Sequence, residues 1–272
     1  MSDQHSRAEL FRSLHVPSAP IVLVNAWDAA SARIVEDAGA HAVATTSAGV
    51  AWSLGAPDGD VLGRDLATEL VGRVVGAVSV PVTADIESGF GSTPEQVAET
   101  VRAVLAAGAV GVNLEDAAPD GGPGLREVAD QCARLAAARS AGAEVGVPVY
   151  VNARIDTFLR GAGGLPETLD RAAAFLEAGA DGIFVPGVVD PETVAALVAG
   201  IPAPVNIMAG PGAPTVPELA RLGVARVSLG SAVAEAAYAV VRRAAEEAFG
   251  PGGYGSLADA LDYGTVNELM RR

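Results

Sequence analysis

The chain has 272 residues, of which 50% are apolar and 19% charged, so it can bury one large hydrophobic core. Its 33 acidic and 18 basic residues give a net charge of −15, which argues against nucleic acid or an anionic membrane as a partner. The chain contains no lysine, which excludes Schiff-base catalysis, a covalent pyridoxal phosphate anchor and a phosphate-loop lysine.

The histidines and the cysteine limit the chemistry further. His5, His15 and His41 all lie in the first sixth of the chain, which argues against a multi-histidine zinc site or a histidine-based triad. Cys132 is the only cysteine, so an internal disulfide framework is excluded. Because glycine, proline or a charge interrupts every long apolar run, we expect neither a signal peptide nor a membrane span. We expect a cytoplasmic protein with one domain over residues 1–272.

Eight apolar segments typical of β-strands follow one another, and two signatures mark where they begin. In the first signature a proline precedes an apolar run, at residues 20–25, 81–85, 148–152 and 204–208. In the second, a glycine that would end a helix precedes a strand-like run, with Gly39, Gly108, Gly179 and Gly223 in that place. The signatures alternate, four of each. This order predicts an α/β fold, a parallel (β/α)8 barrel of the TIM type.

Helical patterns lie between these segments, at residues 64–78, 94–107, 125–141, 166–178 and 232–248. Thr93 precedes a proline and stands three residues before Gln96, which predicts a capped helix start. Asp190 stands before a proline in the same way. Residues 250–272 follow the barrel as a C-terminal helical appendage, in which we expect one further helix over residues 257–271.

Two carboxylates end the third predicted strand. In a barrel of this kind the chemistry lies at the carboxyl ends of the strands, where Asp85 and Glu87 precede a glycine-rich turn. Strand alternation places residues two apart on the same face, so we expect the two side chains to lie together. Because neighbouring carboxylates repel each other unless they share a cation or a proton, the pair is a candidate site for a hard divalent cation.

Further polar residues are expected at the same end of the barrel. Asn152 and Arg154 stand at the offsets of the two acids when the proline signatures are aligned. Other residues near strand ends are Asn25, Trp27, Asp28, Thr46, Ser47, Glu115, Asp116, Asp156 and Asn206. Such a ring suits a divalent cation that holds an anionic substrate, whose other carboxylate Arg154 binds with its guanidinium. In a second interpretation, Arg154 only forms a structural ion pair with Glu87 or Glu115.

Six motifs carry a resemblance to a known family: N-A-W-D at 25–28, T-T-S-A-G-V at 45–50, L-G-A-P-D at 54–58, D-I-E-S-G-F-G at 85–91, N-L-E-D at 113–116 and N-A-R-I-D at 152–156. In this order they resemble the isocitrate lyase/phosphoenolpyruvate mutase superfamily. The resemblance implies a (β/α)8 barrel that forms homodimers or homotetramers, often with the last helix exchanged between paired subunits. It also implies Mg²⁺ and a small 2-oxo or 2-hydroxy carboxylate substrate, with a C–C or P–C bond made or broken beside the carboxylate.

The resemblance implies a role for each matching residue. Asp85 looks like the direct ligand of Mg²⁺, with Mn²⁺ as an alternative ion, and Glu87 and Glu115 would hold the ion through waters. Glu87 departs from the pattern, since many members have a second aspartate there. We expect substrate contacts from Trp27, Thr46, Ser47, Ala48, Asn152, Arg154 and Asn206, and catalytic roles for Asp58 and Arg154. The ion would polarise the 2-oxo oxygen and stabilise the enolate that forms as the adjacent bond breaks.

The loop at residues 116–124 departs from the family pattern. Members that cleave isocitrate or methylisocitrate have a catalytic cysteine in this loop, and members that act on P–C bonds have a lysine and an asparagine. Here the loop reads D-A-A-P-D-G-G-P-G, without any of these residues. The P–C enzymes also have a histidine near the end of the sixth strand, where this chain has Pro186. Glycines around two prolines predict a mobile lid, with an ordinary surface loop as the alternative.

The sequence leaves three functions open. The first is a Mg²⁺-dependent lyase or decarboxylase that breaks a C–C bond in a small 2-oxo or 2-hydroxy acid. The second is a P–C bond enzyme of the phosphoenolpyruvate mutase or phosphonopyruvate hydrolase type. The third is a non-catalytic carboxylate-binding or scaffold protein that keeps the metal site.

Overall fold

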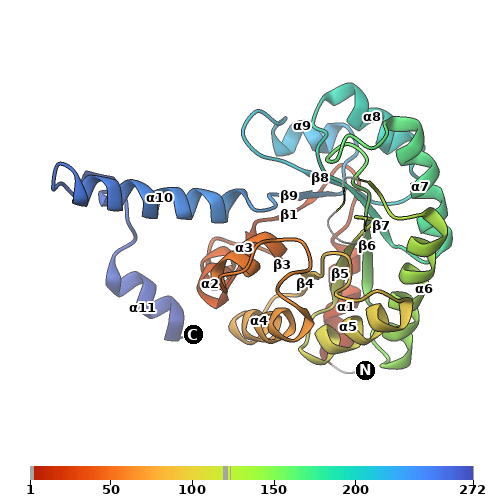
Figure 1. Ribbon diagram of the computed structural model, residues 1–272, viewed down its shortest axis with the longest axis horizontal. Coiled ribbons are helices and arrows are strands. Elements are labelled where there is room, and N and C mark those ends of the chain that lie inside the picture. The colour runs from red at the N-terminus through yellow and green to blue at the C-terminus, as the bar shows by residue number, and fades with distance from the viewer. Residues whose placement is uncertain (1–2, 119–121, 123, 272) are drawn as a thin grey trace.

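The computed structural model describes residues 3–118, 122 and 124–271, and its centre is a barrel of parallel strands surrounded by helices (Figure 1). The strands are β1 (Ile21–Leu23), β2 (Asn25–Ala26), β3 (Val43–Thr45), β4 (Val82–Asp85), β5 (Gly111–Glu115), β6 (Tyr150–Arg154), β7 (Gly182–Val185), β8 (Val205–Met208) and β9 (Arg226–Ser228). β1 pairs with β9 and β2 pairs with β3, so these two short segments are halves of one barrel strand. All eight predicted strands and the (β/α)8 barrel are confirmed.

The helices are α1 (Asp3–Ser13), α2 (Ala29–Asp37), α3 (Ser47–Ser53), α4 (Arg64–Ala77), α5 (Pro94–Ala106), α6 (Val128–Glu144), α7 (Leu165–Glu177), α8 (Pro191–Gly200), α9 (Val216–Arg221), α10 (Ala232–Phe249) and α11 (Tyr263–Arg271). The five predicted helices are present, although α6 begins three residues later than predicted. The helix predicted over residues 257–271 was too long, since a 3-10 turn at Gly255–Leu257 precedes α11. α1 was not predicted.

Local sequence signals explain where the helices begin and end. Thr93 accepts a hydrogen bond from the Gln96 backbone N–H, and the Gln96 side chain accepts one in return, which is the predicted capping box. Asp190 caps α8 by accepting from the Thr193 backbone N–H, without a reciprocal bond. The four glycines predicted to end helices have φ between +91° and +107°, a region that costs glycine little.

α1 closes the amino-terminal end of the barrel. Its Phe11 is fully buried and lies edge-on to Tyr150, with 5.5 Å between ring centroids. Burying such a ring stabilises the fold by roughly 2–3 kcal/mol. Gln4 Nε2 donates to the carbonyl oxygens of Leu105 (2.7 Å) and Ala109 (2.8 Å), the segment that leads into β5. Because this end is sealed, a ligand must reach the barrel from the carboxyl ends of the strands.

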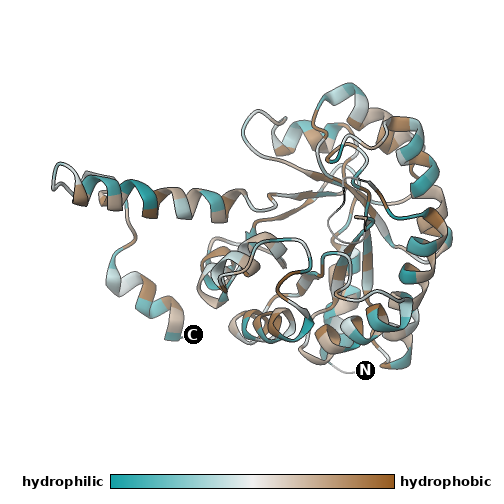
Figure 2. Ribbon diagram, in the orientation of Figure 1, coloured by the Kyte–Doolittle hydropathy of each residue, from teal (hydrophilic) through white to brown (hydrophobic). Residues whose placement is uncertain are grey.

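α10 extends away from the barrel, and the chain then turns back so that α11 runs toward the barrel (Figure 1). Apolar residues predominate in the barrel strands, while α10 carries both apolar and polar residues along its length (Figure 2). Phe249 and Tyr263 are 89% and 85% exposed, although Leu269 of α11 is buried. None of the helices that the structure describes is long and apolar enough to cross a membrane. The single domain over residues 1–272 stays a prediction.

Candidate active site

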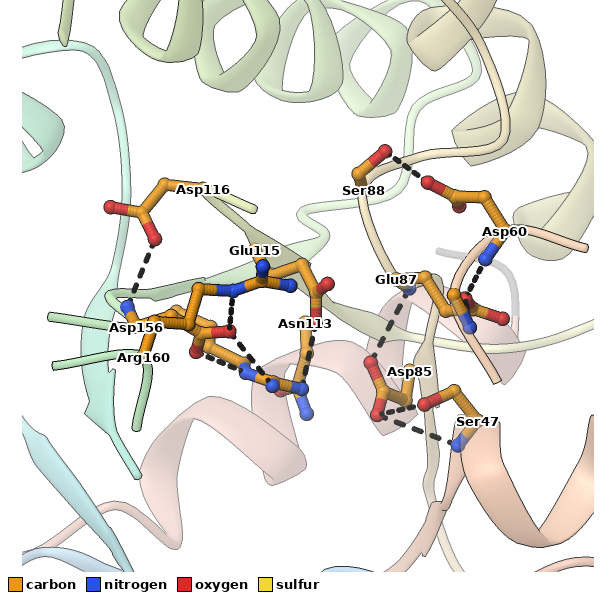
Figure 3. A network of polar contacts seen from close by, with 12 residues as sticks. Ser47, Asp60, Asp85, Glu87, Ser88, Asn113, Glu115, Asp116, Asp156 and Arg160 are labelled. Carbon is orange, nitrogen blue, oxygen red and sulfur yellow. Dashed lines mark hydrogen bonds and ion pairs between the residues drawn. The ribbon is translucent and has the colours of Figure 1, made fainter. Parts of the chain in front are cut away.

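Acidic side chains gather at the carboxyl ends of β4 and β5 (Figure 3). Asp85 is the last residue of β4, and Glu115 is the last residue of β5. The strand register places Asp85 beside Asn113 and Glu115 beside Arg154, the last residue of β6. The predicted metal ligands and the predicted substrate arginine therefore meet at one end of the barrel.

Asp85 is held by hydroxyl and amide groups of the neighbouring strand end. Its Oδ2 accepts from Ser47 Oγ (3.1 Å) and from the Ser47 backbone N–H (3.5 Å), while its own N–H donates to Thr45 Oγ1 (2.9 Å). Burial raises the pKa of Asp85, and repulsion from Asp58 acts in the same direction, against Arg154 and Ser47. A further positive charge close to this carboxylate would therefore be favourable.

The Glu87 carboxylate faces the loop after α3, as Figure 3 shows. Its Oε2 accepts from the backbone N–H groups of Gly59 (2.8 Å) and Asp60, and the Asp60 carboxylate accepts from Ser88 Oγ. Burial raises the pKa of Glu87 to about 7, and nearby acids led by Asp58 add to the shift. The exposed loop of residues 54–63 thus shapes one wall of the site.

Glu87 does not lie beside Asp85 by strand alternation, so that part of the sequence argument was wrong. β4 ends at Asp85, and Glu87 and Phe90 have φ of +51° and +50°. Residues other than glycine rarely adopt this conformation, which costs on the order of 1 kcal/mol each. Arg134 of α6, whose side chain is fully buried, donates from both terminal nitrogens to the Gly91 carbonyl (2.8 and 3.0 Å) and so supports the turn.

Arg154 connects the acids of two strands. Its Nη1 lies 2.7 Å from Glu115 Oε2, and its Nε and Nη2 lie 2.7 and 3.0 Å from the two oxygens of Asp156. Burial disfavours the Arg154 charge, but Glu115 and Asp156 outweigh this effect and raise its pKa. Burial also raises the pKa of Glu115, against the attraction of Arg154. The predicted ion pair of Arg154 with Glu115 is present, and that with Glu87 is not among the contacts of the described residues.

A second layer of charges supports Arg154 from behind. Asp156 is fully buried, and Arg160 Nε lies 3.4 Å from its Oδ2. The Asp156 backbone N–H donates to Asp116 Oδ1 (2.9 Å), and Asp116 Oδ2 lies 3.2 Å from Arg171 Nη1. These contacts fix the direction in which the Arg154 guanidinium points.

Other predicted site residues lie around this cluster. Thr46 immediately precedes α3, without a capping hydrogen bond from its side chain, and Ser47 and Ala48 are the first two residues of the helix; all three are buried. Asp58 lies on the exposed loop, near enough for its charge to act on Asp85, Glu87 and Glu115. Trp27 follows β2, and Asn152 and Asn206 are 1% exposed inside the barrel. The roles predicted for all of these residues stay predictions.

Several residues of the cluster were not predicted as site residues. These are Asp60, Ser88 and Asn113, of which the last two stand in motifs that also contain predicted site residues. Asp156, which contacts Arg154, is expected from the sequence near the strand ends but without a role. Asp60 belongs to the same loop as Asp58, which was a signal for its position.

Comparisons with known proteins place the chain in a family. The family model described as phosphoenolpyruvate phosphomutase matches residues 11–249. An uncharacterized protein of Mycobacterium tuberculosis (strain H37Rv) is 39% identical over 222 residues, which are 81% of each chain. The 2-methylisocitrate lyase of Escherichia coli K12 is 31% identical over 66% of this chain and 62% of that enzyme.

One solved structure with the same fold contains bound ligands. Phosphonopyruvate hydrolase in complex with oxalate and Mg²⁺ has a TM-score of 0.85 and 26% identity, over 97% of this chain and 94% of that chain. This chain therefore belongs to the phosphoenolpyruvate phosphomutase family, and it is an enzyme of the phosphoenolpyruvate mutase/isocitrate lyase superfamily of lyases and mutases.

Proposed function

We propose that this enzyme is a Mg²⁺-dependent lyase or decarboxylase that breaks a C–C bond beside the carboxylate of a small 2-oxo or 2-hydroxy acid. The observation that carries the proposal is the surplus of buried carboxylates at the strand ends. Asp85, Glu87 and Glu115 all have raised pKa values, with burial as the main cause. Arg154 forms ion pairs with both Glu115 and Asp156, so its single positive charge does not neutralise the negative charge of these carboxylates. A divalent cation would do so.

The donor set fits Mg²⁺ held partly through waters. Among residues 3–118, 122 and 124–271, no three His, Cys, Asp or Glu side chains are arranged to hold an ion by themselves. Mg²⁺ commonly keeps several waters and binds one or two carboxylates directly, and Mn²⁺ accepts similar oxygen ligands. Asp85 would be the direct ligand, with Glu87 and Glu115 bound through waters. When bound, the ion would supply positive charge that polarises the 2-oxo group and stabilises an enolate.

Arg154 would bind the substrate carboxylate. Three of its N–H groups point to Glu115 and Asp156, so two of the five that a guanidinium carries are left for a ligand. Because Asp156 accepts from both Nε and Nη2, the guanidinium plane of Arg154 cannot turn freely. Arg154 would therefore be held in one orientation before the substrate binds, and would orient the substrate carboxylate.

Asp58 would exchange the proton with solvent. It is exposed on the loop after α3, whereas Asp85, Glu87 and Glu115 are buried or half-buried. Its charge acts on Asp85, Glu87 and Glu115, which supports a role beside these acids. An exposed carboxylate next to a buried site can take up a proton from the substrate and release it to water.

We favour cleavage of a C–C bond over a P–C bond because residues 116–124 contain no lysine or asparagine and Pro186 stands in place of the histidine. The C–C cleavage would proceed without the loop cysteine of the isocitrate and methylisocitrate lyases. Residues 119–121 and 123 of the predicted lid lie outside the described residues, so closure of this loop stays a prediction. A panel of oxaloacetate, 2,3-dimethylmalate, 2-methylisocitrate and phosphonopyruvate, assayed with Mg²⁺, tests the proposal. Turnover of a C–C substrate supports it, and turnover of phosphonopyruvate alone would establish the P–C alternative. Binding without turnover of any of them would contradict both.

We also propose that the enzyme forms a homodimer or homotetramer through α10 and α11. Val241 and Phe249 of α10 are 64% and 89% exposed, and an apolar groove beside α2 is lined by Ile21, Ile34 and Val35 among others. Exchanged helices would cover both surfaces at once. Light scattering after size-exclusion chromatography tests this, with Val241→Asp and Phe249→Asp together expected to give monomers. A monomeric wild-type protein would contradict it.

A further inference from the structure

A second polar cluster lies inside the barrel below the acids. It comprises the side chains of Asn113, Asn152, Asn206 and Arg226, each at most 4% exposed. In the part of the chain that the structure describes, the Arg226 side chain makes one hydrogen bond, from Nη2 to Asn113 Oδ1 (3.2 Å), and its Nε and Nη1 have no partner. A buried arginine thus contacts the site through one asparagine.

Arg226 determines which way the Asn113 amide points. A guanidinium can only donate, so the atom of Asn113 that it contacts must be the carbonyl oxygen. The same oxygen accepts from Asn152 Nδ2 (2.9 Å). Since Oδ1 faces Arg226 at the start of β9, the Asn113 NH₂ group on the other side of the planar amide faces the strand ends.

The Asn113 NH₂ group lies where a ligand oxygen is expected. Asn113 is paired in register with Asp85 and stands two residues before Glu115, and it lies among the acids in Figure 3. Both hydrogen bonds that the Asn113 side chain makes with the described residues are accepted by its Oδ1, and its Nδ2 donates neither of them. Asn113 is 4% exposed, and an amide donor in such a position is expected to find its acceptor in a water or a ligand.

The neighbouring amides differ in this respect. Asn152 Nδ2 donates to Asn113 Oδ1 (2.9 Å) and Asn206 Oδ1 (3.2 Å). Asn206 Nδ2 donates to the Ile207 carbonyl and to Ser228 Oγ, both at 3.1 Å. Their donors are used inside the barrel, so of the three amides Asn113 is the one whose NH₂ group is left for a ligand.

We infer that Asn113 donates a hydrogen bond to an oxygen of the bound carboxylate substrate, and that Arg226 is the positioning residue that orients this amide. The inference rests on the proposed function, which supplies the carboxylate. Asn113 adds a neutral donor to a site that is rich in negative charge, where a second acid would repel the substrate.

Calorimetric titration with oxalate at saturating Mg²⁺ tests the inference. Asn113→Ala should raise the Kd for oxalate about tenfold or more, the loss expected for one hydrogen bond to a charged oxygen. Asn113→Asp should raise it further, because it replaces the donor with a negative charge. The Kd for Mg²⁺ alone, measured by titration without oxalate, should change by less than about threefold in Asn113→Ala.

A double-mutant cycle separates positioning from a purely structural role. Arg226→Met should raise the oxalate Kd in the wild-type background and have little further effect in the Asn113→Ala background, since Arg226 acts through Asn113. Thr83→Val is the matched control, because Thr83 is also buried in the barrel and its Oγ1 has no partner among the described residues. It should leave the oxalate Kd within about twofold.

The outcomes separate the two proposals. Oxalate affinity that is unchanged in both Asn113→Ala and Asn113→Asp would overturn the role of Asn113 and leave the proposed function standing. Equal losses from Arg226→Met in both backgrounds would overturn the positioning role of Arg226. Failure of the wild-type protein to bind oxalate with Mg²⁺ would overturn the proposed function and this inference together. Should Arg226→Met fail to fold, the two Asn113 variants still decide the assignment of Asn113.

Discussion

The two ends of the barrel differ in whether their carboxylates have partners of opposite charge. At the amino-terminal end, Asp181 contacts Arg12 (2.5 Å) and Arg139, and it accepts from the Val151 backbone N–H (2.8 Å). At the carboxyl-terminal end, Asp85 accepts hydrogen bonds chiefly from Ser47, and three acids have raised pKa values. In the first arrangement, arginines of the same chain neutralise the carboxylate. In the second, negative charge remains that a bound cation could neutralise.

This difference separates residues that hold the fold from residues that hold a ligand. A carboxylate with matched partners stabilises the folded state, so its removal should lower stability. A carboxylate that is buried against other acids costs stability, so its presence indicates a function. Variants at the two ends should therefore change different measurements.

The largest effect is expected for Asp85→Ala. Turnover with the best substrate of the panel should fall at least about 1000-fold, because the proposed direct metal ligand is lost. Stability without added metal should change by less than about 1 kcal/mol, since the variant also relieves repulsion among the acids. Turnover assays and urea unfolding measure both quantities. An active Asp85→Ala variant, or one that is strongly destabilised, would contradict the assignment of the carboxyl-terminal end to ligand binding.

Arg154→Lys should lower kcat/KM about 100-fold. An ammonium group cannot bind Asp156 through two parallel hydrogen bonds and also reach Glu115, as Arg154 does. Steady-state kinetics check this, with Arg102→Lys as a control whose ion pair with Glu144 is on the surface. Unchanged kinetics in Arg154→Lys would limit Arg154 to a structural role.

Asp181→Ala should lower the free energy of unfolding by about 2 kcal/mol or more, because two arginines lose their partner. The same variant should keep its Mg²⁺ affinity, since Asp181 lies at the opposite end of the barrel from the acids. Chemical denaturation measures the first quantity and calorimetry the second. A stable variant with impaired metal binding would reverse the assignment of the two ends.

The smallest effect per step of the measurement is the pH dependence of stability caused by His15. Burial lowers the pKa of His15 from 6.5 to about 3, with the charge of Arg226 adding to the shift. Between these values the unfolded chain binds the proton and the folded chain does not, so stability falls as the pH drops below 6.5. The slope should be at most about 1.4 kcal/mol per pH unit. His15→Gln should remove this part of the slope, and an identical slope in the variant would contradict the assignment.

The sequence contained enough information for the barrel and for the position of the acids. Repeated proline and glycine signatures mark all eight strands, and strand ends in a barrel converge regardless of the loops between them. For this reason Asp85, Glu115 and Arg154 could be placed in one site before their contacts were known.

Features that depend on distant contacts could not be predicted in the same way. Glu87 takes its position from backbone N–H groups 27 and 28 residues earlier, and Asn113 takes its orientation from Arg226, 113 residues later. Neither contact follows from periodicity. The path of α10 away from the barrel is a further example, because an amphipathic helix can bury its apolar face on its own chain or on another.

Titration of Mg²⁺ into the protein tests the central claim that the unmatched acids form a cation site. We expect one ion bound per chain in the wild-type protein and in Asp181→Ala, and loss of detectable binding in Asp85→Asn, which keeps the shape of the side chain without its charge. Equal Mg²⁺ affinity in the wild-type protein and Asp85→Asn would contradict the account.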